Sequence, residues 1–201
     1  MIEIIAIVLA SGSSTRFSGE KLLQTLGGRT VIESVIGNLE KSLVSGIIVV
    51  AGPSVSAFLN SKGYGNAVIN RSPQDGIGAS ISMGIRSISE SASALITPGD
   101  MPFFLSSYVD KLIRLHQANP SSVACCIHNW QRMSPAIFPP SSRHDLMSLP
   151  AGKGGMHVIS SGKFIVKELE VLDENILLDI DTRQDLERAR LLVERYLSDS
   201  L

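Results

Sequence analysis

Short apolar runs alternate with longer segments of helical periodicity along this chain. In each run the apolar residues are consecutive, as is typical of strands buried on both faces of a sheet. The intervening segments place apolar residues three and four positions apart, and Thr30 with Glu33 has the pattern of a capping box. The predicted strands span residues 4–9, 46–50, 67–69, 94–97 and 123–127, and the predicted helices span residues 30–43, 104–116 and 181–197.

This alternation predicts an α/β fold with three layers, in which a mostly parallel sheet carries helices on both faces. The sequence shows no repeat, low-complexity segment or linker, so residues 1–201 are expected to form a single domain. Ligands of such sheets bind beyond the carboxyl ends of the strands. The loops at Gly12, Gly52 and Gly99 are therefore expected to share one binding region.

The composition excludes several classes of partner. With 44% hydrophobic residues, a chain of 201 residues can bury one sizeable core. Its formal net charge is -1 and it has no basic run, so nucleic acid is not expected as a partner. No apolar run approaches the ~20 residues of a membrane span, so no membrane association is expected.

The first apolar run and the cysteines favour a cytoplasmic protein. Glu3 stands where a signal peptide would carry positive charge, so the run is interpreted as a strand and not as an export signal. Cys125 and Cys126 are adjacent, which disfavours a relaxed disulfide between them. They are interpreted as small buried hydrophobes, in preference to a metal role with His128. A reducing cytoplasm fits this cysteine usage.

The segment after the first predicted strand has the composition of a phosphate-binding loop. Its small residues let backbone N–H groups approach an anion closely. Arg16 and Lys21 add two positive charges at the far end of the loop. The spacing excludes a Walker loop, and Ser11 and Ser13 flank Gly12 where a dinucleotide fingerprint needs another glycine. A polyphosphate is the expected ligand, and a purely structural turn is the alternative.

Two acidic groups could hold a cation. Asp100 follows a predicted buried strand, where its carboxylate can reach a metal without competing for strand hydrogen bonds. Asp179 and Asp181 alternate before the last helix, which is expected to put both on one face of a strand. Either could share Mg²⁺ or Mn²⁺ with Asp100, because these ions prefer oxygen ligands. The alternatives are a plain turn aspartate at Asp100 and capping of the last helix by Asp181 or Thr182.

Two glycine-rich segments could also approach a ligand. Residues 70–84 interleave glycines with serines, so either a flat ring or a phosphate can come close to the helix start, or the glycines only permit tight helix packing. Lys153, in Lys-Gly-Gly, belongs either to an anion loop for the acceptor or to a helix start. The four histidines show no ligand spacing and are interpreted as structural or rim residues.

Four motifs, in order and across nearly the whole chain, resemble those of the molybdenum cofactor nucleotidyltransferases (MobA/MocA-like NTP transferases). The family's opening L-A-A-G-x-S-x-R-M-G-x-x-K is similar to the run from Leu9 to Arg16, with Lys21 at the expected distance. The later matches are Gly76, Ser80 and Gly84 in the middle glycine-serine segment, Gly99-Asp100-Met101-Pro102 for G-D-M-P, and Asp179-Ile180-Asp181-Thr182 for D-I-D-T.

The resemblance implies a Rossmann-like nucleotidyltransferase fold of the nucleotide-diphospho-sugar transferase type. It implies that Arg16 and Lys21 bind phosphates, that Asp100 with Asp181 binds Mg²⁺ (or Mn²⁺), and that Arg16, Lys21 and Asp100 are catalytic. The nucleotide-binding residues that it implies are Leu9, Ala10, Ser11, Gly12, Ser13, Ser14, Arg16, Lys21, Ser80 and Gly99.

This chain departs from the family at two places. Gly19 sits one position later than the usual glycine of the first loop. The acceptor segment that commonly reads G-H-P is Met133-Ser134-Pro135 here, so Ser134 replaces the family's histidine. Ser134 and Lys153 are the residues expected on the acceptor side.

The implied reaction is attack by a phosphate monoester, that of molybdopterin, on the α-phosphorus of CTP or GTP, with pyrophosphate leaving. Such a monoester has a second pKa of about 6, so it is largely dianionic at neutral pH and needs no general base. The two acidic motifs look more like the cytidylyl branch and favour CTP. A recipient molybdoenzyme or its chaperone is a further implied partner. The alternatives are a sugar phosphate or another phosphorylated metabolite as acceptor, and a nucleotide-binding module without turnover.

Overall fold

A seven-stranded sheet forms the centre of the computed structural model, which describes residues 2–12, 17, 19–65 and 67–196. In spatial order its strands are β5 (Ala67–Ile69), β4 (Gly46–Ala51), β1 (Ile4–Ala10), β6 (Ser93–Pro98), β8 (Gln131–Phe138), β7 (Val123–His128) and β9 (Val166–Glu170). Neighbouring strands are parallel except that β8 is antiparallel to both β6 and β7. The mostly parallel sheet predicted from the apolar runs is therefore confirmed. β2 (Thr25–Leu26) and β3 (Arg29–Thr30) form a separate antiparallel pair.

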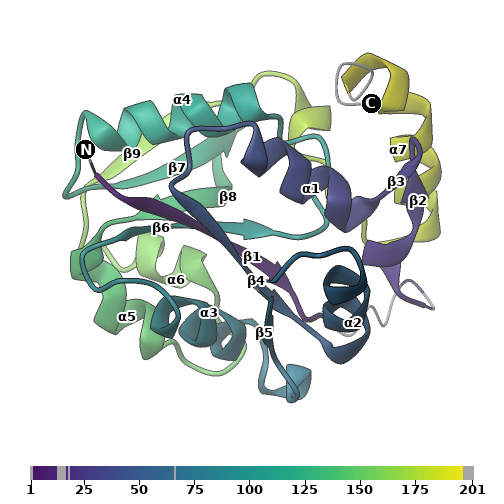
Figure 1. The fold of residues 1–201 in the computed structure, drawn as a ribbon. Coiled ribbons are helices and arrows are strands. Elements are labelled where there is room, and N and C mark those ends of the chain that lie inside the picture. Colours follow the sequence, from purple (N-terminus) through teal and green to yellow (C-terminus); the bar gives the residue numbers. More distant parts are fainter. Residues whose placement is uncertain (1, 13–16, 18, 66, 197–201) are drawn as a thin grey trace.

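Helices cover both faces of the sheet, as Figure 1 shows for α1 and α4 on one side and α3, α5 and α6 on the other. Ala6 and Val8 of β1 face the first core, whereas Ile7 faces the second. Because successive side chains of a strand point to opposite faces, β1 has to be apolar at every position. The first core is completed by α1 (Val31–Glu40), α2 (Pro53–Ser61), α4 (Ser106–Gln117) and α7 (Arg183–Tyr196), and the second by α3 (Ile77–Arg86), α5 (Arg143–Met147) and α6 (Gly155–Ser160).

Local signals account for where these helices begin. At α1 the predicted capping box is present: the N–H of Glu33 donates to Oγ1 of Thr30 at 3.3 Å, and the N–H of Thr30 donates to Oε2 of Glu33 at 2.8 Å. α3 lies close against β1, because a Cβ at Gly84 would overlap Cγ2 of Ile7. Tight packing is therefore the reason for this glycine, as one of the two interpretations of residues 70–84 expected.

The structure corrects several predicted elements. β8 and β9 were not predicted, α1 ends at Glu40 rather than at residue 43, and α4 begins at Ser106 rather than at residue 104. The expectation that Asp179 and Asp181 share one face of a strand is wrong. They lie in an irregular segment between the 3₁₀ turn η4 (Glu174–Leu177) and α7.

His116 and the two cysteines have packing roles. His116 is buried, with Nδ1 3.1 Å from the carbonyl oxygen of Ser122 and Nε2 2.9 Å from Oγ of Ser93. Burial lowers its pKa, so the ring is neutral at pH 7. Cys125 and Cys126 are free and buried, and burial raises the pKa of the Cys125 thiol to about 11.

The turn between β7 and β8 has an unusual backbone. Asn129 and Trp130 have φ values of 47° and 66°, in the left-handed region that favours glycine. Trp130 is 96% exposed at the tip of this hairpin. In the part of the chain that the structure describes, no helix combines the length and apolar character needed to cross a bilayer.

Candidate active site

The loop after β6 brings three distant parts of the chain together at the carboxyl end of the sheet. The N–H of Gly99 donates to the carbonyl oxygen of Leu9 at 2.9 Å, and the N–H of Ile180 donates to that of Asp100 at 3.0 Å. A Cβ at Gly99 would lie 3.0 Å from the Leu9 oxygen. A glycine is thus needed for the loop to pass so close to β1. Asp100 is held between the end of β1 and the segment before α7.

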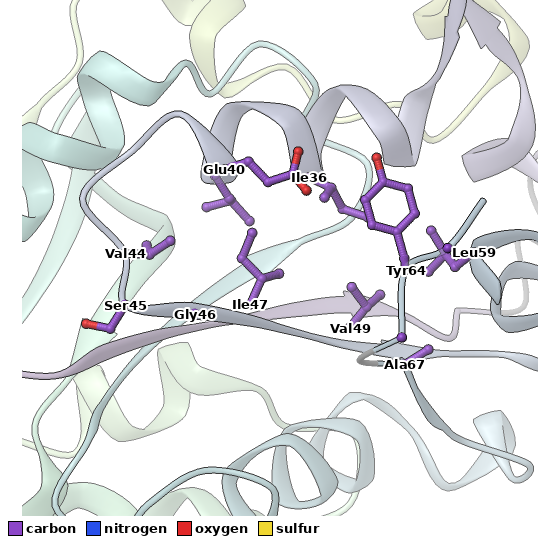
Figure 2. Close-up of a pocket in the computed structure, with 13 residues that line it drawn as sticks. Ile36, Glu40, Val44, Ser45, Gly46, Ile47, Val49, Leu59, Tyr64 and Ala67 are labelled. Carbon is purple, nitrogen blue, oxygen red and sulfur yellow. The ribbon is translucent and has the colours of Figure 1, made fainter.

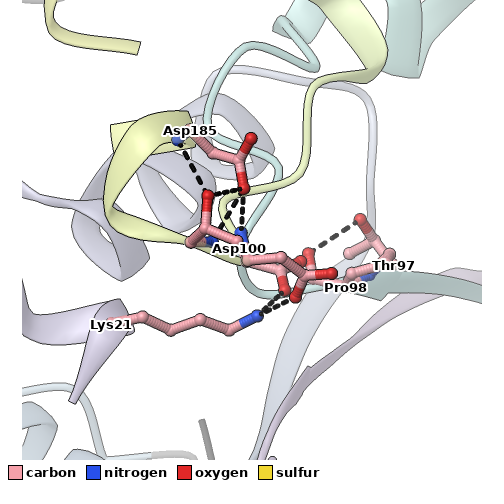
Figure 3. A network of polar contacts seen from close by, with 7 residues as sticks. Lys21, Thr97, Pro98, Asp100 and Asp185 are labelled. Carbon is pink, nitrogen blue, oxygen red and sulfur yellow. Dashed lines mark hydrogen bonds and ion pairs between the residues drawn. The ribbon is translucent and has the colours of Figure 1, made fainter. Parts of the chain in front are cut away.

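Lys21 bridges two carboxylates in this region (Figure 3). Its Nζ atom lies 2.6 Å from Oδ2 of Asp100 and 2.8 Å from Oδ1 of Asp181. The three side chains are only 12%, 17% and 25% exposed, in that order. An ammonium has three donors, so one N–H of Lys21 remains for a further acceptor such as a phosphate oxygen.

The charges of this cluster perturb one another. Burial disfavours the charged form of Lys21, but the two carboxylates outweigh it and raise the pKa of the ammonium above its ordinary value. Partial burial, together with the charges of Asp181 and Asp100, raises the pKa of Asp179. Among the described residues, Oδ1 of Asp100 is buried without a hydrogen-bond partner. A buried carboxylate oxygen in this state is a ready ligand for a cation.

The alternative role of helix capping falls to Thr182. Its Oγ1 accepts from the N–H of Asp185 at 3.2 Å, while Oδ2 of Asp185 accepts from the N–H of Thr182 at 2.7 Å. This reciprocal pair caps the start of α7. In Figure 3 the hydrogen bonds of Asp185 lie above the ammonium of Lys21 and separate from its contacts.

A cavity of about 210 Å³, here called the site cavity, opens next to this cluster. Lys21 and Asp100 lie on its polar side, and Ser11 and Ser80 form another part of its wall. Apolar side chains complete the wall, which suits a flat ring with a charged tail. The lining residues are Leu9, Ser11, Gly12, Lys21, Leu22, Pro73, Gly76, Ile77, Ser80, Pro98 and Asp100.

Five of the ten predicted nucleotide residues line this one cavity: Leu9, Ser11, Gly12, Lys21 and Ser80. Ser13, Ser14 and Arg16 lie outside the described residues, so their predicted roles stay predictions. Ala10 is buried in the core, and Gly99 is buried against β1. Both adjoin the site cavity through their neighbours Leu9, Ser11, Pro98 and Asp100, which line it.

The two predicted acceptor residues both lie near the start of α3. Ser134 lines a small cavity of about 30 Å³ that shares Leu9, Ile77 and Pro98 with the site cavity. Lys153 precedes α6, whose N-cap is Gly154, so this segment is a helix start, and the acceptor role of Lys153 stays a prediction. The carbonyl oxygen of Lys153 would be 3.1 Å from a Cβ at Gly78, which brings this segment against the start of α3.

Some residues of the site were not predicted. Leu22, Pro73, Ile77 and Pro98 supply the apolar wall, and their sequence neighbourhood gives only a weak signal. Phe17 is 2% exposed and packs in the first core, and its sequence neighbourhood gave no sign of this.

A larger cavity of about 390 Å³ lies between α1, β4 and the segment before β5 (Figure 2). Its wall is mostly apolar, with Ile36, Ile47 and Leu59 among its residues, and its polar side chains are Glu40, Ser45 and Tyr64. It lies near the amino end of β4, away from the Lys21 cluster, and contains none of the predicted site residues. Size alone therefore does not identify the functional site.

The fold is that of nucleotidyltransferases, and it carries a lysine and two aspartates beside a cavity at the carboxyl end of its parallel strands. The chain belongs to the family described as the MobA-like NTP transferase domain, whose profile matches residues 6–168.

Relatives and solved structures agree with this assignment. A probable molybdenum cofactor guanylyltransferase of Pyrococcus horikoshii is 30% identical over 132 residues, which is 64% of this chain and 64% of the relative. A nucleotidyl transferase from Methanothermobacter has a TM-score of 0.83 at 21% identity, with 96% of this chain and 98% of that chain covered. A Mycobacterium tuberculosis protein in complex with manganese has a TM-score of 0.77 at 21% identity, with 94% and 98% covered. These structural likenesses establish a shared Rossmann-like nucleotidyltransferase fold.

Proposed function

We propose that this protein transfers CMP or GMP from a nucleoside triphosphate to the phosphate of molybdopterin and releases pyrophosphate, with Mg²⁺ or Mn²⁺ as cofactor. The observation that carries the proposal is the contact of Lys21 with Asp100 and Asp181 beside the site cavity. In the reaction a phosphate oxygen of the acceptor bonds to the α-phosphorus, and the bond from that phosphorus to the bridging oxygen breaks.

The acidic residues fit a divalent cation that also contacts the substrate. Asp100 offers a buried oxygen without a hydrogen-bond partner. Asp100 and Asp181 both contact the ammonium of Lys21, so their carboxylates lie close to the same point. Within the described part of the chain, no group of three His, Cys, Asp or Glu side chains could hold a metal alone. Two carboxylates that leave the remaining positions to phosphate oxygens and water are the usual protein ligands of Mg²⁺. When bound, the metal would neutralise negative charge on the phosphates.

The residues of this chain would act by positioning and by charge. Lys21 keeps one donor for a phosphate oxygen, so it can stabilise the pyrophosphate as it leaves. Arg16 is proposed to do the same from the first loop. The apolar wall of the site cavity excludes water from the base, and the dianionic acceptor needs no general base.

The base and the acceptor are the finer points of the proposal. The motif resemblance favours CTP, whereas the name of the Pyrococcus relative favours GTP. Ser134, in place of the family's histidine, keeps a sugar phosphate or another phosphorylated metabolite as the second candidate for the acceptor. A recipient molybdoenzyme or its chaperone would take up the product.

One experiment distinguishes these candidate functions. Pyrophosphate release is measured with each of the four nucleoside triphosphates, with Mg²⁺ or Mn²⁺, and with molybdopterin or a panel of sugar phosphates. Release with molybdopterin and either CTP or GTP supports the proposal. Release with a sugar phosphate instead supports the second candidate, and tight nucleotide binding without release from any acceptor supports a binding module.

A further inference from the structure

Three buried polar side chains from three different elements form one hydrogen-bond network at the wall of the site cavity. Ser11 follows β1, Asn70 follows β5, and Ser80 lies in α3; they are 7%, 2% and 3% exposed. Oγ of Ser80 lies 2.7 Å from Oγ of Ser11 and 3.0 Å from Nδ2 of Asn70. Groups buried this deeply require hydrogen bonds, so the arrangement of protons in the network is constrained.

The orientation of the Asn70 amide follows from a backbone contact. Its Oδ1 accepts from the N–H of Ser72 at 2.8 Å. The reverse orientation would set the amide NH₂ against this N–H, two donors facing each other. Nδ2 must therefore face Ser80, and Oγ of Ser80 accepts a hydrogen bond from Asn70.

The two serines carry one more hydroxyl proton than their mutual hydrogen bond uses. Ser11 and Ser80 have one hydroxyl proton each, and their mutual hydrogen bond uses one of the two, whichever residue donates. Asn70 uses none, because it donates to Ser80. One hydroxyl proton is left over, and the two hydroxyl-bearing residues both line the site cavity. The wall of the site cavity therefore offers an O–H donor.

We propose that Asn70 is a positioning residue that keeps this O–H donor directed at a carbonyl oxygen or an unprotonated ring nitrogen of the nucleobase. Asn70 itself is not among the residues that line the site cavity. It acts through the two serines, while the phosphates are held at Lys21. The inference rests on the proposed function, since it assumes a nucleoside triphosphate in the site cavity.

The test uses Asn70→Asp, which keeps size and shape but replaces the amide donor with an acceptor. The ionised carboxylate still accepts from Ser72, but it also takes the hydroxyl proton of Ser80, and Ser11 then donates to Ser80. No proton is left for the base. Near pH 8 the variant should bind the preferred nucleoside triphosphate roughly tenfold more weakly than the wild type, by calorimetry without acceptor. Binding of inorganic tripolyphosphate, which has no base, should be unchanged.

The pH dependence of nucleotide affinity distinguishes this positioning role from a purely structural one. A protonated carboxyl group has the donor and acceptor of the amide, and burial raises its pKa. The affinity of Asn70→Asp relative to the wild type at the same pH should therefore recover as the pH falls toward 5. Asn70→Ala, which introduces no charge, serves as the second variant and should weaken nucleotide binding while tripolyphosphate binding stays at the wild-type level.

Asn38→Asp is the matched control, because Asn38 is also buried and its Nδ2 donates to the carbonyl oxygen of Pro102 at 2.8 Å. It should change nucleotide and tripolyphosphate binding by the same factor at every pH. An unchanged ratio of the two affinities in Asn70→Asp, or a loss that does not recover at low pH, overturns the inference. If the wild type binds none of the four nucleoside triphosphates, it is the proposed function that fails.

Discussion

The Nζ atom of Lys21 lies 2.6 Å from Oδ2 of Asp100, although the two residues are 79 positions apart in the chain. Asp181 contacts the same ammonium from a third segment. The lysine thereby neutralises part of the negative charge of Asp100 and Asp181. Without it the two partly buried carboxylates would repel each other. A divalent cation and its phosphate ligands would have to share this position with the ammonium. Removing the lysine is therefore expected to affect the binding of the metal and of the phosphates.

Replacement of Lys21 by methionine is expected to weaken nucleoside triphosphate binding by tenfold or more and to leave nucleoside binding nearly unchanged. The reason is that the ammonium is a point charge directed at phosphate, and methionine preserves most of its length. Calorimetric titration with both ligands checks the prediction. Equal losses for the two ligands would place Lys21 away from the phosphates.

The Asp100→Asn variant is expected to remain folded and to lose roughly a hundredfold in metal-dependent turnover. One ligand charge disappears while the turn after β6 keeps its shape. The measurement is pyrophosphate release across a range of Mg²⁺ concentrations, with circular dichroism as the test of folding. Asp145→Asn on α5 is the control and should behave as the wild type. Full activity of Asp100→Asn at saturating Mg²⁺ would rule out the proposed metal site.

Ser134→His tests the acceptor. If molybdopterin is the acceptor, this variant should preserve or raise its use, because the imidazole restores a donor toward the pterin side. Nucleotide affinity should not change, since Ser134 lines the small neighbouring cavity and not the site cavity. A smaller phosphate ester would instead lose the space that it needs. Pyrophosphate release with molybdopterin and with sugar phosphates distinguishes the two, and reduced release with molybdopterin counts against it as the acceptor.

The contact between α3 and β1 predicts a large loss of stability for Gly84→Ala. The added Cβ would overlap Cγ2 of Ile7 and approach Val50, so helix and strand must separate at an expected cost of about 1–3 kcal/mol in the free energy of unfolding. Gly65→Ala is the matched control, because a Cβ there meets nothing within 4 Å and its φ is not positive. Urea unfolding followed by circular dichroism should separate the two variants, and similar midpoints would show that α3 can move at little cost.

The capping pair at α7 predicts a pH-dependent contribution to stability. Burial acts in the opposite direction, but hydrogen bonds from Thr182 and from the N–H of Asp181 lower the pKa of Asp185 below its ordinary value of 3.8. Because the folded protein has the lower pKa, the stabilisation is present above pH 4 and is lost as the pH falls through the lowered value.

Asp185→Asn should therefore be less stable than the wild type at pH 7, by about 0.5–1 kcal/mol, with the difference shrinking toward pH 3. Thermal unfolding at both pH values is the measurement. Glu187→Gln, on the exposed face of the same helix, is the control. A difference that stays constant with pH would mean that the charge of Asp185 is not what caps α7.

The sequence predicted the parallel half of the fold well because those strands are continuous apolar runs. It did not predict β8, in which Gln131 and Arg132 are exposed and Pro135 interrupts the pattern. β9 is an edge strand that alternates charged and apolar residues and leaves Glu168 and Glu170 exposed, so its apolar signal is weak. An antiparallel insertion and an edge strand depend on neighbours that a local pattern does not contain.

The same limit applies to the site. That Gly12 and Asp100 would meet followed from the rule that loops emerge together at the carboxyl ends of parallel strands. That Lys21 would touch Asp100 and Asp181 at once did not follow, because Asp181 reaches the cluster from an irregular segment and not from a strand. The network through Asn70 depends on which way one amide points, and no sequence pattern encodes that.

Trp130 gives this protein an unusual optical property. It is the one tryptophan of the chain, and at 96% exposure its indole is already surrounded by water in the folded state. Its fluorescence therefore changes little when the cores come apart, and an unfolding curve recorded from tryptophan emission would understate the transition. The same emission shifts to the blue only when something displaces water from the hairpin tip, so the chain carries a reporter of surface contact that is insensitive to the folding of its interior.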